Sequence, residues 1–220
     1  MKLTLFDIDG TLMEFTEGHA EAFSVGFKEA YNIDASVNEI NAFGLTDQLI
    51  ILEVLRKHGL SEKEVMANID KCMNAMERHF EEVIGSSIVK MLPGVPELFA
   101  ALKEQGHIIG LVTGNLEPIA MAKMRKVGLQ DYVLVGGYGS DHLSRTELVK
   151  LAMKKANVKP EDTFLFGDTP LDIKAAKEAG VTAVGVATGS HKKEDLAGAD
   201  HILAGLDDTQ KVLDILSGKD

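Results

Sequence analysis

The stretch LFDIDGTL, Leu5–Leu12, places two aspartates one residue apart directly after an apolar opening. Leu3–Phe6 is apolar enough to predict a short strand, which Gly10-Thr11 would end. Side chains alternate between the faces of a strand, so Asp7 and Asp9 should point to one side, about 7 Å apart. Burying two such carboxylates costs free energy unless a cation or a proton lies between them. The stretch therefore predicts a charged site at the end of the first strand.

The composition limits the classes of protein to consider. The chain has 220 residues, of which 45% are hydrophobic and 26% charged, as in globular proteins with one large domain or a core and a smaller unit. Its net charge of −11, without basic runs, argues against nucleic acid or anionic membranes as partners. Cys72 is the single cysteine, which excludes an internal disulfide and is compatible with a reducing compartment. We find neither a signal peptide nor a membrane span, and we expect a cytoplasmic monomer or dimer.

The chain divides into two parts with different sequence patterns. Residues 17–85 carry helical periodicity, with capping-box patterns at Ser36–Glu39 and Ser61–Glu64, and predict about four helices and no strand. Further along, helix-like and strand-like segments alternate, which predicts a parallel sheet covered by helices. The first strand must join this sheet, because an isolated strand is unstable. We therefore predict a doubly wound, Rossmann-like α/β core of residues 1–14 and 88–220, with a helical domain of residues 15–87 inserted into it.

Polar residues follow the expected strands of the α/β part. The expected helices are 96–105, 118–127, 146–156 and 171–179, and the strands after them are 107–113, 132–136, 163–167 and 182–186. The stretch VTGN, Val112–Asn115, ends one strand, GDTPLD, Gly167–Asp172, ends another, and Arg145 opens a helix. In doubly wound sheets, ligands bind beyond the carboxyl ends of the strands. We therefore expect these residues to converge with Asp7 and Asp9.

The converging residues complement one another chemically. Asp7, Asp9 and Asp168 offer hard oxygen ligands, which suit Mg²⁺ and leave it waters for a substrate to replace. Phosphate-monoester hydrolysis has one of the largest barriers that enzymes overcome, and no single carboxylate supplies the required acceleration. A metal, a cationic side chain, a nucleophile and an acid acting together fit that reaction.

The remaining residues of the group suit a phosphoryl ligand. Thr113 and Asn115, with the amides around Gly114, offer neutral hydrogen-bond donors to phosphate oxygens. Arg145 offers a permanent positive charge. The pattern therefore predicts a phosphate-binding site beside the acidic one.

FDIDGTL, LVTGN and FGDTPLDIKAA, in this order, resemble the first, second and fourth motifs of the haloacid dehalogenase superfamily, over nearly the whole chain. The resemblance implies that Asp7 is the nucleophile that forms an aspartyl-phosphate. Asp9 would protonate the leaving group and then activate water. Asp7, the backbone carbonyl of Asp9 and Asp168 would hold Mg²⁺, and Asp172 would order a metal-bound water or the cationic residue. Thr113–Asn115 would bind the phosphoryl group. The helical insertion would be a cap that closes over the site, as in phosphoglycolate phosphatases, whose substrate is a small phosphorylated metabolite.

The third motif of the superfamily departs from its usual form, which is a lysine and often Lys-Pro. The matching stretch reads HLSRTELV, and Arg145 is the expected cationic residue because arginine can bind phosphate through two nitrogens. Lys150 is the alternative, but it would project from the next turn of the helix. Lys159-Pro160 lies too close to Asp168 to fill the role.

The residues also bear on which reaction is expected. Dehalogenases and phosphonate hydrolases of the superfamily lack an acid at the place of Asp9, so a phosphatase is favoured. A phosphosugar mutase stays an alternative, because His19 falls where mutases and many phosphatases carry a hinge histidine. A further alternative is a receiver-like protein that binds a phosphoryl group without turnover. Measuring turnover of an aryl phosphate would separate the receiver from an enzyme.

The loop FGLTDQLI separates the phosphatase from the mutase. A mutase needs a basic residue there for a second phosphate, whereas Thr46, Asp47 and Gln48 offer none. If the loop touches the substrate, Asp47 should disfavour a second anionic group and favour a hydroxyl-bearing or cationic leaving group. The alternative is that Asp47 only caps the helix expected at 48–58.

Overall fold

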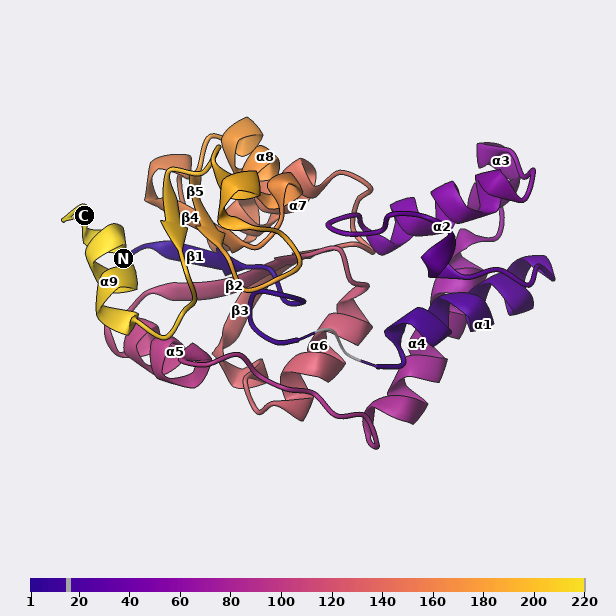
Figure 1. Cartoon of the computed structure of the whole chain (residues 1–220), viewed down its shortest axis with the longest axis horizontal. Coiled ribbons are helices and arrows are strands. Elements are labelled where there is room, and N and C mark those ends of the chain that lie inside the picture. Colours follow the sequence, from indigo (N-terminus) through magenta and orange to yellow (C-terminus); the bar gives the residue numbers. More distant parts are fainter. Residues whose placement is uncertain (15–16, 220) are drawn as a thin grey trace.

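The computed structural model describes residues 1–14 and 17–219. An α/β unit and a helical segment lie side by side (Figure 1). The strands are β1 Leu3–Phe6, β2 Ile108–Thr113, β3 Val133–Tyr138, β4 Thr163–Gly167, β5 Thr182–Val186 and β6 His201–Leu203. The α-helices are α1 His19–Tyr31, α2 Asp47–Lys57, α3 Glu62–Met66, α4 Ile69–Ile84, α5 Val95–Glu104, α6 Glu117–Lys126, α7 Arg145–Ala156, α8 Pro170–Ala179 and α9 Thr209–Ser217. Short 3₁₀ helices are η1 Val37–Glu39, η2 Gln130–Tyr132, η3 Pro160–Asp162 and η4 Lys193–Leu196.

The strands form one parallel sheet in the order β3-β2-β1-β4-β5-β6. β1 lies between β2 and β4, with Leu3 opposite Ile108 on one side and Thr163 on the other. The strand order reverses at β1, and such a reversal opens a crevice at the carboxyl ends of the strands. The predicted doubly wound α/β fold is confirmed, and the two aspartates follow the strand at which the reversal occurs.

Two helical layers cover the sheet, as its continuous apolar strands require. Helices α7 and α8 lie on one face, packed on Leu3, Leu5 and Leu165. Helices α5 and α9 lie on the other face, packed on Phe6 and Phe166, whose rings stack with centroids 4.7 Å apart. Because both faces of β1 are buried, its position and register are tightly fixed, and so is the start of the loop that holds Asp7 and Asp9.

Helices α1–α4 enclose an apolar core that includes Phe27, Phe80 and the buried Cys72, and α6 of the α/β unit adds Ile119 to it. Both predicted capping boxes form, although Ser36 opens only the 3₁₀ helix η1 and not a long helix. The connections to the α/β unit run side by side: the amide of Glu14 donates to the carbonyl of Lys90 at 2.9 Å. The division at residues 15 and 88 stays a prediction, and residue 15 lies outside the described residues.

The carboxyl-terminal part adds β6 and α9, which the sequence patterns did not predict. β6 is only three residues long, and its pairing with β5 depends on a long-range contact and not on a local pattern. Along the described ranges, no helix is both long enough and apolar enough to span a bilayer.

Candidate active site

The loop after β1 brings the first motif next to the fourth. The amide of Asp7 donates to the carbonyl of Phe166 at 2.9 Å, which ties the end of β1 to the end of β4. Gly10 has a φ of 87°, and a Cβ there would lie 2.5 Å from Oδ2 of Asp168. Thr11 donates through its hydroxyl to Oδ1 of Asp168 at 3.1 Å. Glycine at this turn therefore lets the chain pass close to the Asp168 carboxylate.

Three carboxylates form the acidic part of the site. Oxygens of Asp7, Asp168 and Asp172 lie within 4.8 Å of one another, and all three side chains are buried. Burial raises the pKa of Asp7 to about 7, an effect that Asp172 and Asp9 strengthen and that Arg145 opposes. Burial, with repulsion from Asp7 and Asp172, raises the pKa of Asp168 to about 8. These acids carry more negative charge than one guanidinium balances, so the donor set fits a divalent cation with oxygen ligands.

Asp172 lies behind the other two acids. Its Oδ2 accepts the hydroxyl of Thr169 at 2.6 Å and the amide of Thr169 at 3.1 Å, forming a capping box at the start of α8. Its other oxygen accepts a hydrogen bond from Arg145. With both oxygens occupied, Asp172 is better placed to orient Arg145 than to contact a metal directly.

Arg145 is the first residue of α7 and is buried beside the nucleophile candidate. Its Nη1 lies 3.3 Å from Oδ1 of Asp7 and also donates to Asp172. Its Nε is buried, and no atom of the described residues accepts a hydrogen bond from it. A buried donor without a partner costs free energy, so this N–H is available for an oxygen of a bound phosphoryl group.

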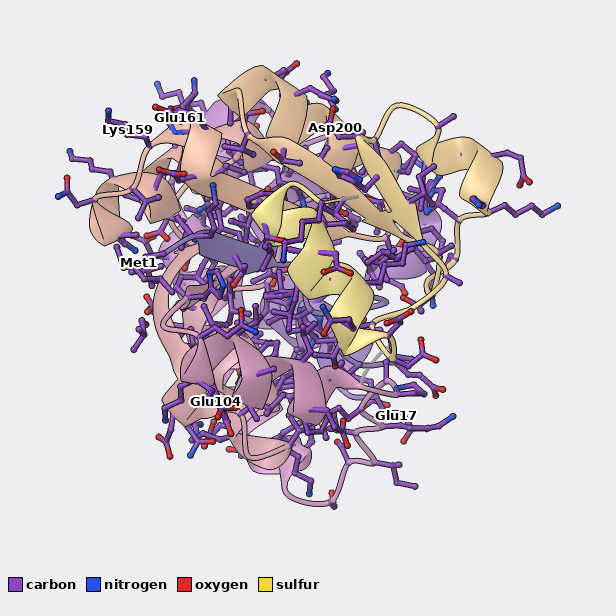
Figure 2. All side chains as sticks on the ribbon, turned by 90° about the vertical axis from the view of Figure 1, so that its left-hand side faces the viewer. Met1, Glu17, Glu104, Lys159, Glu161 and Asp200 are labelled. Atoms are coloured by element: carbon purple, nitrogen blue, oxygen red, sulfur yellow. The ribbon has the colours of Figure 1, made fainter. Side chains whose placement is uncertain are left out.

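The two lysines considered for the third motif, Lys150 and Lys159, lie away from the acids. Lys150 is half exposed on α7 and forms an ion pair with Glu147 at 2.8 Å. Lys159 lies before β4, near the amino ends of the strands, and Figure 2 shows Lys159 and Glu161 at the outer edge of the molecule. Of these three cationic residues, only Arg145 contacts Asp7.

Asp9 has a different cation of its own, which the motif analysis missed. Nζ of Lys123, on α6, lies 2.8 Å from Oδ1 and 2.6 Å from Oδ2 of Asp9, and the lysine side chain is fully buried. Burial alone would raise the pKa of Asp9, but Lys123, His19 and Asn115 together lower it, and the pKa lies below its ordinary value. In sequence, Lys123 is one of three basic residues within four positions of α6. No local pattern separates it from its two neighbours.

The second motif joins this ion pair. Nδ2 of Asn115 donates to Asp9 at 2.9 Å and to the hydroxyl oxygen of Thr113 at 2.7 Å, while its Oδ1 accepts from Lys123 at 2.6 Å. Asn115 therefore holds Asp9 and Lys123 in place. Phosphate binding by Thr113, Gly114 and Asn115 stays a prediction.

His19 connects the helical segment to the same cluster. Its Nδ1 lies 3.4 Å from Nζ of Lys123, which can only donate, and its Nε2 lies 3.2 Å from Oδ2 of Asp47, which accepts. These partners suit a ring whose Nε2 donates to Asp47. The hinge-side histidine of the sequence analysis thus lies within hydrogen-bonding distance of groups on both sides of the site.

Asp47 is not the cap of α2, so that alternative is wrong. Thr46 is the N-cap, and its hydroxyl accepts from the amide of Leu49 at 3.4 Å. The buried carboxylate of Asp47 instead accepts the amide of Leu116 at 2.9 Å, at the start of α6, as well as contacting His19. The acid therefore fastens the helical segment to the core.

The loop around Asp47 is docked on the core through backbone and side-chain hydrogen bonds. The amide of Asp47 donates to the carbonyl of Gly114 at 2.8 Å, and Nε2 of Gln48 donates to the carbonyls of Gly139 and Ser140 at 2.8 and 2.9 Å. A Cβ at Gly114 would lie 2.2 Å from the carbonyl oxygen of Leu45. Glycine at 114 is therefore needed for the observed approach of the two segments.

The helical segment and the α/β core enclose a cavity of about 300 Å³ between them. Asp7, Asp9 and Arg145 line it on the core side, and residues of α1, η1, the loop 40–47 and α2 line it on the other. Burial, opposite charges and a neighbouring cavity are the features expected of a catalytic site.

Known proteins are similar to this chain in sequence and in fold. The family profile of haloacid dehalogenase-like hydrolases matches residues 4–186. The chain is a haloacid dehalogenase-like hydrolase. The probable phosphatase IndB of Dickeya dadantii is 30% identical over 210 residues, which cover 90% of this chain and 86% of that protein. The phosphoglycolate phosphatase of Aquifex aeolicus is 26% identical over 97% of both chains. The β-phosphoglucomutase structure from Clostridium difficile superposes with a TM-score of 0.76 over 99% of this chain and 98% of that one. At 19% identity, this likeness shows the fold alone.

Membership of this family confirms the resemblance stated from the three motifs and the prediction that the chain is an enzyme. The individual site residues keep the roles predicted for them as proposals.

Proposed function

We propose that this hydrolase is a Mg²⁺-dependent phosphatase that cleaves a small phosphorylated metabolite through an aspartyl-phosphate intermediate. The observation that carries the proposal is the buried group of Asp7, Asp168 and Arg145 at the end of β1, with the unpartnered Nε of Arg145 inside it. The relatives named phosphatases support the same reaction.

In the first step, an oxygen of Asp7 attacks phosphorus, and the bond between phosphorus and the alcohol oxygen breaks. Arg145 stabilises the negative charge on the phosphoryl oxygens and holds Asp7 in position. Asp9 gives a proton to the departing alcohol. Asp7 and Asp168, with the backbone carbonyl of Asp9, would hold Mg²⁺, which neutralises charge on the phosphoryl group when it is bound.

In the second step, Asp9 takes a proton from water, and the water oxygen attacks phosphorus and releases Asp7. Lys123 favours the ionised form of Asp9, which is the form that this step needs. The two residues therefore act as one acid–base unit, because Lys123 contacts both oxygens that exchange the proton.

The mutase alternative finds no support at the cavity. A mutase must hold a second phosphate, but among the described residues from 17 to 87 no lysine or arginine lines this space. The receiver-like alternative is disfavoured by family membership, since the family profile is one of hydrolases. The cytoplasmic location predicted from Cys72 stays a prediction, as does the oligomeric state.

The proposal is tested by assaying 4-nitrophenyl phosphate with the purified protein and Mg²⁺. We expect continuous turnover, loss of turnover with a chelator, and recovery on adding Mg²⁺. Asp7→Asn is the matched inactive control, because it keeps the shape of the side chain and removes the nucleophile. A single uptake of phosphate without turnover would show a receiver, and full activity of Asp7→Asn would refute the mechanism.

A further inference from the structure

The cavity has two chemically different walls. The core wall holds Asp7, Asp9 and Arg145, where the phosphoryl group would react. The opposite wall must therefore receive the alcohol that leaves. Apolar side chains dominate it, and the larger ones are Phe23, Val37, Ile40, Phe43, Leu45 and Ile50.

No lysine or arginine of the described residues 17–87 lines the cavity, and three of them form ion pairs outside it. Lys28 pairs with Asp34, and Arg78 pairs with Glu29, all with side chains about half exposed or more. Arg56 pairs with Glu53 in the same way. A second anionic group on a substrate would therefore find no free cation of the described segment on this wall.

The polar groups close to the wall make an anion still less favourable. Asp47 adds a buried carboxylate whose interactions are already formed with Leu116 and His19. Lys123 already donates to Asp9 and Asn115. The Nη1 of Arg145 already pairs with Asp7 and Asp172. A carboxylate or second phosphate here would be desolvated against apolar side chains and near like charge, which is costly.

The volume limits the size of the alcohol. A space of about 300 Å³ lies at the lower end of the volumes of small-molecule sites. The phosphoryl group takes part of that space, so the site favours a small alcohol.

Resting on the proposed phosphatase function, we infer that the enzyme selects phosphate monoesters of a neutral, largely apolar alcohol. It discriminates against alcohols that carry a carboxylate or a second phosphate. This separates its substrate class from that in the name of the Aquifex aeolicus relative, since phosphoglycolate carries a carboxylate next to the ester carbon.

The test compares three phosphate esters of similar length on the wild-type enzyme with Mg²⁺. They are 4-methylpentyl phosphate, 4-phosphooxybutanoate and 4-aminobutyl phosphate. The first two are nearly isosteric and differ in terminal charge. We expect kcat/KM for the methylpentyl ester to exceed that for the carboxylate ester by about 100-fold, on the scale of discrimination by apolar pockets. Equal values, or a preference for the carboxylate or the amine, would overturn the inference.

Variants of the wall show whether it sets this ratio. Phe43 lies 48% exposed at the rim, with its ring edge-on to His191 at a centroid distance of 6.2 Å. Phe43→Arg should lower the ratio of methylpentyl to carboxylate ester at least about tenfold, whereas Phe43→Leu should retain it. Ile40→Lys, at another residue of the wall, is the second variant. An unchanged ratio in both charged variants, with folding verified by circular dichroism, would contradict the inference.

The result is separable from the proposed function. If 4-nitrophenyl phosphate is hydrolysed while the carboxylate ester is the better alkyl substrate, the phosphatase stands and the substrate class is wrong. If no phosphate ester is hydrolysed by the folded, Mg²⁺-supplied protein, the proposed function itself fails and the inference fails with it.

Discussion

Asp7 and Asp9 are one residue apart in sequence, yet the fold gives them opposite electrostatic surroundings. Asp7 lies with Asp168 and Asp172 around one guanidinium, and its pKa is raised to about 7. Among the described residues, Asp9 is the one acid paired with Lys123, it also accepts from the amide of Asn115, and its pKa is lowered. Burial acts in the same direction on both carboxyls. The difference between them therefore comes from how many acids share each cation.

The comparison bears on catalysis. The crowded acids around Asp7 favour a divalent cation, because a bound cation would offset their repulsion. The paired Asp9 needs no metal to stay ionised and is suited to exchange protons. Five experiments break or sharpen this contrast, and they follow from the largest expected effect to the smallest.

Replacing Asp7 removes the proposed nucleophile from the group of three acids. Asp7→Asn should abolish turnover and also the covalent phosphorylation, measured as a gain of one phosphoryl group by intact-protein mass spectrometry. The metal-free variant should unfold at a higher temperature than the metal-free wild type near pH 8, because burying a neutral amide costs less than burying a carboxylate. Phosphoryl transfer to residue 7 of the variant would contradict the assignment.

Replacing Arg145 removes the cation that Asp7 and Asp172 share. Arg145→Ala should lower kcat about 10²–10³-fold, the usual effect of one lost preorganised donor. Lys150→Ala is the matched control on the same helix, and it should stay near wild-type activity because its ion pair with Glu147 is half exposed. If steady-state kinetics gave the reverse ranking, the third motif would belong to Lys150.

Replacing Lys123 should raise the pKa of Asp9, as the pKa of Asp7 is raised. Lys123→Met keeps the apolar stem and removes the charge, so the pKa of Asp9 should rise and kcat should fall about 100-fold. Ionised Asp9 activates water, so the acidic limb of the pH–rate profile should move to higher pH. A merely structural lysine would lower activity without moving that limb.

The same variant tests stability. Leaving Asp9 buried without its cation should cost about 3–5 kcal/mol in the free energy of unfolding near neutral pH, measured by urea denaturation. Adding Asp9→Asn to Lys123→Met removes the unpaired charge and should recover a large part of that loss. Additive losses in the double variant would show that the pair is not coupled.

Both the stability of the metal-free protein and its affinity for Mg²⁺ should depend on pH, because Asp7 and Asp168 titrate. The folded-state pKa values of Asp7 and Asp168 are raised to about 7 and about 8, so the folded protein holds protons that the unfolded chain loses near pH 4. Without metal, stability should therefore fall as pH rises from about 4 to about 8. Mg²⁺ requires the ionised acids, so its apparent affinity should increase with pH up to about 8, by at most about tenfold per unit for each proton released. Thermal shifts at pH 6 and pH 8, with and without Mg²⁺, measure both trends. A larger stabilisation by Mg²⁺ at pH 6 would contradict this account.

Much of the site was predictable because its parts are local. The strand before Asp7, the turn at Gly10 and the acids at 168 and 172 are each marked by apolar runs followed by polar residues. In a parallel sheet, such strand ends meet at one edge. The expected helices of the α/β part agree with the structure to within one or two residues at their ends, since caps and glycines mark where helices start and stop.

The sequence by itself determined the order of the elements, the fold class and the acids that gather at the end of β1. Only the tertiary structure decided which cation each aspartate receives. Lys123 reaches Asp9 from a position 114 residues away, and Asp47 binds Leu116 and His19 instead of capping α2, which was one of the two alternatives for it. The physical reason is that periodicity and capping are local, whereas the pairing of buried charges depends on which elements are packed against each other.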